Sequence, residues 1–179
     1  MVYILLADGF ETIEALAPYD MLKRAQIEVQ LVCMNPIGLE VCSSHGIKVF
    51  ADVFVNNVDL NKMDMLVIPG GMPGTKNIDS HENIDGIIEY AVKNNCYMAA
   101  ICAGPSVLGK RGVLKGREAV CFPGFECFLE GANIQNKRVV TDGRIITAIG
   151  AGAAIDFGLE LVRILSDKDT AEKIRSSIH

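Results

Sequence analysis

Short apolar runs alternate along this chain with segments of helical periodicity, and this alternation constrains the fold more than any other feature of the sequence. VYILL (2–6), EVQLVCM (28–34) and MDMLVIPGG (63–71) have the continuous apolar character of strands buried on both faces. A helix-like segment from about Thr12 to Ala25 separates the first two runs. Such alternation predicts an α/β fold, a mostly parallel sheet with helices on both faces, of the doubly wound, flavodoxin-like kind.

The same order continues toward the carboxyl terminus. Asp79-x-x-Glu82 has the spacing of a capping box, and we expect a helix from about Ser80 to Lys93. YMAAI (97–101) then predicts a strand, and a helix is expected from Ala103 to Lys110. Lesser elements are expected as short strands at 39–42, 47–50 and near Ala119, a short helix between Pro123 and Glu130, a hairpin at Asp142-Gly143, an apolar helix after the Gly-rich GAGAA and a polar helix at the end.

Length and composition favour one domain, residues 1–179. Half of the 179 residues are hydrophobic, which is enough for one substantial core. The net charge is −5 and the 17 Lys and Arg residues are scattered, so nucleic acid is not an expected partner. The amino terminus lacks the features of a secretory signal, and no apolar stretch approaches the roughly 20 residues that cross a bilayer. We therefore expect a cytoplasmic protein that makes no use of a membrane.

Six cysteines are present, and we expect them to be reduced thiols because a chain with a large core and no secretory signal has no need of disulfides. No two of them have CxxC spacing, and the histidines at 45, 81 and 179 stand apart from them. We predict no metal site and no cofactor. His81 and His179 are interpreted as surface residues. The cysteines lie at positions 33, 42, 96, 102, 121 and 127.

Cys102 stands in a context that the other five cysteines do not share. AICAG (100–104) has the small-x-nucleophile-x-small form of a nucleophile elbow, a sharp strand-to-helix turn that exposes the central side chain. The turn places Cys102 at a helix N-terminus, where unpaired N–H groups favour thiolate over thiol. We expect a reactive thiol with a low pKa; a buried core cysteine is the plainer alternative.

Two loops offer partners for this thiol. Gly70 and Gly71 end a neighbouring strand, and the N–H groups there and at Ala103 are candidates for an oxyanion hole; a plain tight turn is the alternative for the glycine pair. Glu11 and Glu14 lie three residues apart at the start of the first predicted helix. Either carboxylate could complement the helix dipole, or point inward and hold a proton against the sulfur. The spacing does not choose between them.

Four segments, in this order and over nearly the whole chain, resemble the ThiJ/PfpI superfamily, and within it the subgroup of the parkinsonism-associated protein deglycase. They are LADGFETIEALAPYDMLKRA, DMLVIPGGMPG, AAICAGPSVL and GAGAAIDFGLELV. The resemblance implies a flavodoxin-like homodimer with an oxidisable nucleophilic cysteine. Carried over by position, Cys102 is the nucleophile and Glu14 is the protonated glutamate that hydrogen-bonds it. Gly71 and Ala103 resemble the backbone N–H donors, and Glu11 is left as a surface or cap residue.

The sequence also departs from the family pattern. Ala103 follows the cysteine where hydrolase members carry histidine, which weakens a peptidase interpretation. Phe122 stands where the deglycase subgroup often has a histidine, so a proton shuttle by that histidine is in doubt. His45 aligns with a common arginine that lies near the other subunit's site in the family dimer; a solvated turn histidine is the alternative. Gly70, Phe122 and His45 are thus candidate pocket or cross-dimer residues, and Cys121 is a candidate resolving thiol for the oxidised nucleophile.

Two classes of function follow. The first is a glyoxalase III or deglycase-like enzyme that acts on methylglyoxal-type 2-oxoaldehydes through the Cys102 thiolate, without cofactor or metal, in carbonyl or oxidative stress. The second is a redox sensor or stress chaperone in which Cys102 is oxidised to sulfenic and then sulfinic acid without turnover. A cysteine hydrolase or peptidase is the less favoured third alternative. We expect the interface of the homodimer near the first helix and the 40s segment.

Overall fold

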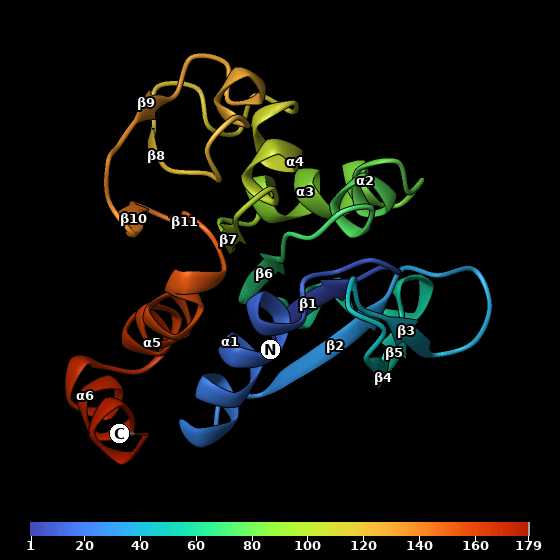
Figure 1. Cartoon of the computed structure of the whole chain (residues 1–179), viewed down its shortest axis with the longest axis horizontal. Coiled ribbons are helices and arrows are strands. Elements are labelled where there is room, and N and C mark those ends of the chain that lie inside the picture. Colours follow the sequence, from blue (N-terminus) through green and yellow to red (C-terminus); the bar gives the residue numbers. More distant parts are fainter. Residues whose placement is uncertain (179) are drawn as a thin grey trace.

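The computed structural model of the protein describes residues 1–178, and a seven-stranded sheet forms its centre (Figure 1). The strand order is β10-β11-β7-β6-β1-β2-β5, and every neighbouring pair is parallel except β10 with β11. This is the flavodoxin-like sheet that the alternating sequence predicts. The strands are β1 (Val2–Leu6), β2 (Val29–Cys33), β5 (Val53–Phe54), β6 (Met65–Ile68), β7 (Tyr97–Ile101), β10 (Val139–Asp142) and β11 (Ile145–Ala148).

Helices cover both faces of the sheet (Figure 1). Helices α1, α5 and α6 pack on one face, and α3 and α4 pack on the other. The helices are α1 (Thr12–Arg24), α2 (Gly74–Asp79), α3 (Ile84–Lys93), α4 (Pro105–Gly109), α5 (Ala154–Leu165) and α6 (Lys168–Ser177). Two small sheets lie outside this sandwich: the antiparallel pair β3 (Glu40–Cys42) and β4 (Lys48–Phe50), and the parallel pair β8 (Glu118–Ala119) and β9 (Asn133–Ile134).

Strand β1 is buried along its whole length, and this burial explains its continuous apolar sequence. Successive side chains of a strand point to opposite faces of the sheet. Val2, Ile4 and Leu6 therefore belong to the core beneath α1 and α5, while Tyr3 and Leu5 belong to the core beneath α3. All five are at most 2% exposed. Because both faces are covered, each position of the strand has to be apolar.

Several expected elements are confirmed. The first helix runs from Thr12 to Arg24, one residue short of its expected end. The Asp142-Gly143 hairpin joins antiparallel strands β10 and β11, and the short strands expected at 39–42 and 47–50 are β3 and β4. The region expected to hold a short helix contains one 3₁₀ turn, Glu126–Phe128. Helix α2 and strands β5 and β9 were not expected from the sequence.

The predicted capping box at Asp79 is wrong. Helix α3 begins at Ile84 rather than near Ser80, and Asp79 is the last residue of α2. Its carboxylate accepts hydrogen bonds from Lys110 at 2.6 Å and from Arg111 at 2.7 Å. The carboxylate thus binds two cations that come later in the chain. Burial alone would raise the pKa of Asp79, but the hydrogen bonds and charges of Arg111 and Lys110 outweigh it, and the pKa lies below its usual value.

Three further findings concern the helix after Cys102, membrane crossing and the last residue of the chain. The helix after Cys102 spans only Pro105–Gly109, shorter than the expected Ala103 to Lys110. Across residues 1–178, the helices are all too short or too polar to cross a membrane. His179, interpreted above as a surface residue, lies outside the described residues.

Candidate active site at the carboxyl edge of the sheet

The carboxyl ends of four adjacent strands bring the predicted site residues together. Strand β1 leads to α1 and Glu14, β6 leads to Gly70 and Gly71, and β7 leads to Cys102. Strand β11, the fourth, leads to Gly150. The strand order reverses at β1, which pairs with β2 on one side and with β6 on the other. A crevice at such a reversal point is where open α/β sheets bind their ligands.

Cys102 occupies a strained turn between β7 and α4. Its φ is 62°, in the left-handed region that residues other than glycine seldom adopt. Two backbone hydrogen bonds hold the turn: the Cys102 N–H donates to the Ala148 carbonyl, and the Phe122 N–H donates to the Cys102 carbonyl, each at 2.9 Å. A Cβ at position 104 would lie 2.4 Å from the Ile68 carbonyl oxygen, so only glycine fits there. The side chain of Cys102 is partly exposed.

Glu14 is the carboxylate that faces this thiol. Its side chain is 1% exposed and forms a hydrogen bond with Cys102. The Gly70 N–H donates to Glu14 Oε2 at 3.0 Å, and the Ala151 N–H also donates to the carboxylate. A Cβ on Gly70 would lie 2.4 Å from Oε2 and 2.7 Å from the Cβ of Cys102, so residue 70 has to be glycine for the pair to meet. The Gly70 N–H group therefore binds the Glu14 carboxylate and is not free to bind an oxyanion.

The pKa values of the pair are both raised. Burial, the largest cause, raises the pKa of Glu14 to about 7, against the hydrogen bonds from Cys102 and Gly70, which lower it. Burial also raises the pKa of Cys102 to about 12, followed by the charge of Glu14 and the hydrogen bond with it. The N–H groups of Ala103 and Gly71 act in the opposite direction, as donors to the sulfur. At pH values between these two pKa values, Cys102 and Glu14 together carry one negative charge and share one proton.

The expectation of a low thiol pKa is therefore wrong. It relied on the N-terminus of the helix that follows Cys102, but α4 has only five residues and offers a weak dipole. Burial is the largest cause of the raised thiol pKa, and the Glu14 carboxylate adds a full charge of the same sign as a thiolate; together they outweigh the N–H groups of Ala103 and Gly71. A thiol beside a carboxylate that can accept its proton is an arrangement that can act chemically as a nucleophile with its own base.

Glu11 and His45 lie outside this arrangement. Glu11 occupies the N-cap position of α1 without capping it, and its carboxylate accepts a hydrogen bond from Ser44 Oγ at 3.2 Å. His45 Nδ1 lies 3.6 Å from Glu11 Oε1, and the His45 side chain is 70% exposed, as expected of a solvated turn histidine. His81 Nδ1 accepts the Asn83 N–H. Over the described part of the chain, neither histidine forms a hydrogen bond with the candidate nucleophile.

Gly150 and Ala151 are site residues that the sequence analysis missed. Ala151 donates to Glu14, and Gly150 has a φ of 157°. A Cβ on Gly150 would lie 3.3 Å from Cδ2 of Phe122, 3.8 Å from Sγ of Cys102 and 3.9 Å from Oε1 of Glu14. The signal available in the sequence was the glycine directly after an apolar strand, the same signal that pointed to Gly70. Phe122, a predicted pocket residue, thus lies beside the pair.

Cys121 is less suited to the role of resolving thiol than its position in sequence suggests. It is buried at 3% exposure and packs in the core beneath α3, whereas Cys102 packs against the core on the other face of the sheet. Burial, followed by the charge of Glu126, raises its pKa to about 11. At neutral pH a thiol with so high a pKa is almost entirely protonated, and it attacks slowly unless a base accepts its proton during attack. A disulfide between the two stays a prediction that these observations weigh against.

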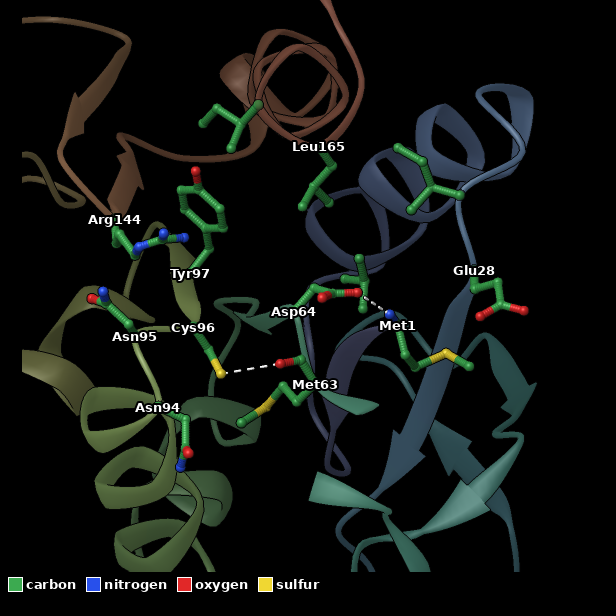
Figure 2. Close-up of a pocket in the computed structure, with 13 residues that line it drawn as sticks. Met1, Glu28, Met63, Asp64, Asn94, Asn95, Cys96, Tyr97, Arg144 and Leu165 are labelled. Atoms are coloured by element: carbon green, nitrogen blue, oxygen red, sulfur yellow. Dashed lines mark hydrogen bonds and ion pairs between the residues drawn. The ribbon is translucent and has the colours of Figure 1, made fainter. Parts of the chain in front are cut away.

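A separate cavity of about 550 Å³ lies at the opposite edge of the sheet, where β1, β6 and β7 begin (Figure 2). Cys96 lines it, but its thiol is buried and donates to the Met63 carbonyl at 3.0 Å. The Arg144 guanidinium lies 4.5 Å from the centre of the Tyr97 ring. This cavity is distinct from the site around Cys102, because the two lie at opposite ends of the parallel strands.

The chain is similar in sequence to a known family. Residues 1–164 match the sequence model of the DJ-1/PfpI family. Protein DJ-1 homolog B of Arabidopsis thaliana is 35% identical over 162 residues, which are 90% of this chain and 37% of the plant protein. Protein dj-1beta of Drosophila melanogaster is 29% identical over 177 residues, 98% of this chain and 94% of the fly protein. The chain spans less than half the length of the two Arabidopsis relatives.

Solved structures agree with this match. Oxidized DJ-1 of Toxoplasma gondii superposes with a TM-score of 0.93 at 32% identity, covering 99% of this chain and 96% of the parasite chain. DJ-1beta of Drosophila melanogaster superposes with a TM-score of 0.93 at 29% identity, again over 99% and 96% of the two chains. The similarity thus covers the whole sandwich and every strand that borders the site.

Proposed function

The chain belongs to the DJ-1/PfpI family, and from this premise we propose that it is a cofactor-independent glyoxalase or deglycase-like enzyme that acts on small 2-oxoaldehydes through Cys102. The observation that carries the proposal is the pair formed by the partly exposed Cys102 thiol and the buried Glu14 carboxyl group. The pKa of Glu14, about 7, lies where a general base works best at neutral pH. We assign the strained turn at Cys102 as a nucleophile elbow, because it presents the sulfur at the carboxyl edge of the sheet.

In the first step the thiol adds to the aldehyde. The Cys102 sulfur forms a bond to the aldehyde carbon while its proton passes to the Glu14 carboxylate, and the carbonyl oxygen becomes the alkoxide of a hemithioacetal. The N–H groups of Gly71 and Ala103, which already donate to the sulfur, are the nearest donors for that developing charge. A thiol that is neutral before attack and loses its proton during attack needs no low pKa.

The second step moves hydrogen within the substrate. Glu14, protonated in the first step, returns that proton to the alkoxide and becomes a carboxylate again. It then removes the proton from the former aldehyde carbon to give an enediolate. This proton is delivered to the neighbouring ketone carbon, while the hydroxyl proton on the former aldehyde carbon passes to the ketone oxygen. The aldehyde carbon is thereby oxidised to a thioester and the ketone reduced to an alcohol, so no external oxidant or reductant is required. Water then cleaves the thioester to give a 2-hydroxy acid and the free thiol. Glu14 is the ionisable group placed to carry these protons, since it contacts the sulfur.

The proposal includes a homodimer, small reactive carbonyls as substrates, and a role in carbonyl or oxidative stress. Support for the dimer comes from apolar side chains exposed on α1 and on the β3–β4 hairpin. A role for His45 across that interface stays a prediction.

Turnover of methylglyoxal tests the enzyme. We expect the wild type to form lactate, Cys102→Ser to lose the activity by at least about a hundredfold, and Cys127→Ser to keep it. Cys127 is the matched control because its side chain is exposed and distant in sequence from the pair. Lactate formation that survives in Cys102→Ser would overturn the proposal.

A redox sensor or stress chaperone is the second candidate, and one observation favours it. The N–H groups of Gly71 and Ala103 that donate to the sulfur would also stabilise a sulfenate or sulfinate at Cys102. The similar Toxoplasma gondii structure is of an oxidized protein. Mass mapping after mild peroxide treatment tests this candidate: Cys102 should gain oxygen before the buried Cys33 and Cys96. Equal modification of the three would contradict it.

A further inference from the structure

The space beside the Cys102 sulfur has one apolar wall. The point at which a Cβ on Gly150 would stand lies 3.3 Å from the Phe122 ring, 3.8 Å from the sulfur and 3.9 Å from the Glu14 carboxylate. Three groups of different chemistry therefore converge on one small volume: a nucleophile, a base and an aromatic ring. Because Gly150 has no side chain, the ring, the sulfur and the carboxylate can all approach this point.

The backbone of Phe122 is held by hydrogen bonds, one of them to Cys102. The Phe122 N–H donates to the Cys102 carbonyl at 2.9 Å, and the Phe122 carbonyl accepts the Phe125 N–H at 3.1 Å. The preceding residue, Cys121, is buried and anchors the same segment in the core. Phe122 is 47% exposed, so apolar surface of this residue is available beside the thiol. An exposed aromatic ring on a backbone held in place is a contact surface for an apolar ligand group.

The charges around the pair disfavour an anionic ligand. Glu14 carries the charge that most strongly raises the pKa of Cys102, and Glu11 in turn raises the pKa of Glu14. Above pH 7 the pair already holds one negative charge. A substrate with a carboxylate next to its carbonyl would therefore meet negative charge of the same sign as its own.

We propose that Phe122 is a specificity-determining residue, whose ring forms a subsite for the apolar or aromatic substituent of an uncharged 2-oxoaldehyde. The proposal rests on the enzyme proposed above and names the substrate class of that site. An aryl or alkyl group on the ketone carbon packs on the ring while the aldehyde carbon faces the sulfur. Phenylglyoxal fits this description better than glyoxal, which has no substituent, and better than glyoxylate, which is charged.

Relative turnover is the first test. We compare kcat/KM for phenylglyoxal and methylglyoxal in the wild type, Phe122→Ala and Phe122→Leu. The aromatic contact should favour phenylglyoxal by about three- to tenfold in the wild type. This ratio should fall toward one in Phe122→Ala and only partly in Phe122→Leu. Phe128→Ala removes another exposed ring from the same loop and should leave the ratio unchanged.

Alkylation of Cys102 gives a second measurement that needs no turnover. The rates for N-phenylmaleimide and N-methylmaleimide are compared in the same variants, with the modified peptide identified by mass spectrometry. Iodoacetamide and iodoacetate, which differ in charge, provide the electrostatic comparison. We expect the phenyl reagent and the neutral reagent to be favoured in the wild type. The phenyl preference should disappear in Phe122→Ala, and the preference for the neutral reagent should remain.

The two measurements separate the subsite from the enzyme. A phenyl preference that depends on Phe122 without any turnover would support the subsite and contradict the proposed enzyme. Turnover with a substrate ratio and a maleimide ratio that are both unchanged in Phe122→Ala would overturn the subsite and leave the enzyme standing. As a control, the urea midpoint of each variant is compared with that of the wild type. Equal midpoints show that a changed ratio does not result from partial unfolding.

Discussion

At the scale of single residues, the site depends on where one proton lies. Glu14 is 1% exposed and has a pKa of about 7, and the Cys102 thiol donates to it. Below pH 7 the carboxyl group is protonated and cannot accept the thiol proton. Above pH 7 it is ionised and can accept that proton as sulfur attacks. The reactivity of the sulfur should therefore follow the ionisation of Glu14 and not that of the thiol alone.

The pH profile of Cys102 alkylation tests this dependence. With iodoacetamide, the rate in the wild type should rise with pH through an inflection near 7. Glu14→Gln removes the base and should move the inflection up to the range of a thiol that has no base beside it, above about 8.5. Glu11→Gln is the control: it removes a charge that raises the pKa of Glu14, so the inflection should remain and shift slightly downward. An unchanged profile in Glu14→Gln contradicts the assignment of Glu14 as the base.

At the scale of elements, the close contact of α1 and α5 positions the site. Helix α1 carries Glu14, and the 3₁₀ turn Ala151–Ala153 that supplies an N–H to Glu14 leads directly into α5. The two helices approach at Gly158, where a Cβ would lie 2.9 Å from both the Pro18 Cα and the Met21 Cγ. The small residue therefore sets the distance between two elements that both reach the thiol.

Two glycine-to-alanine substitutions in helices should have opposite effects on the free energy of unfolding. Gly158→Ala forces α1 and α5 apart and should destabilise the protein by about 1–3 kcal/mol. Gly86→Ala, in α3, meets open space and should stabilise it by about 0.5–1 kcal/mol, because alanine restricts the unfolded chain and favours the helix. Urea unfolding of both variants measures the difference. Equal effects of the two changes would mean that α1 and α5 can accommodate a methyl group at position 158, which would contradict the close contact.

At the scale of the whole molecule, several large apolar side chains are exposed to solvent near α1. Ile13 on α1 is 45% exposed, and Ile47 and Phe50 of the β3–β4 hairpin segment are 52% and 73% exposed. The hairpin is fastened to the start of α1, since the Ser44 N–H donates to the Phe10 carbonyl at 2.9 Å. Exposed apolar side chains on adjacent segments favour a protein interface, and the proposed homodimer would cover them.

Light scattering at micromolar concentration tests the dimer. The wild type should have the mass of two chains, and Phe50→Glu should shift the protein toward one chain because it places a charge in the interface. Val92→Glu is the matched control: Val92 is 55% exposed on α3, away from the proposed interface, and the change should leave the mass unchanged. A monomeric wild type would contradict the dimer.

The sequence by itself determined the features that are encoded locally. Continuous apolar runs required strands buried on both faces, Asp142-Gly143 required a hairpin, and the small residues around Cys102 indicated a sharp turn. Each of these depends on backbone sterics or on burial within a few residues, which composition and spacing record directly. Cys102 was indicated by its own sequence context, but the choice of Glu14 as its partner came from resemblance to a family, because spacing did not separate Glu14 from Glu11.

Only the tertiary structure decided how those parts act on one another. The fold brought Lys110 and Arg111 to Asp79 and so removed the predicted capping box. It buried Glu14 against the thiol, which raised both pKa values where the sequence had indicated a lower one for Cys102. Desolvation and Coulomb interactions depend on distances between segments that are remote along the chain, and such distances exist only once the sheet has formed.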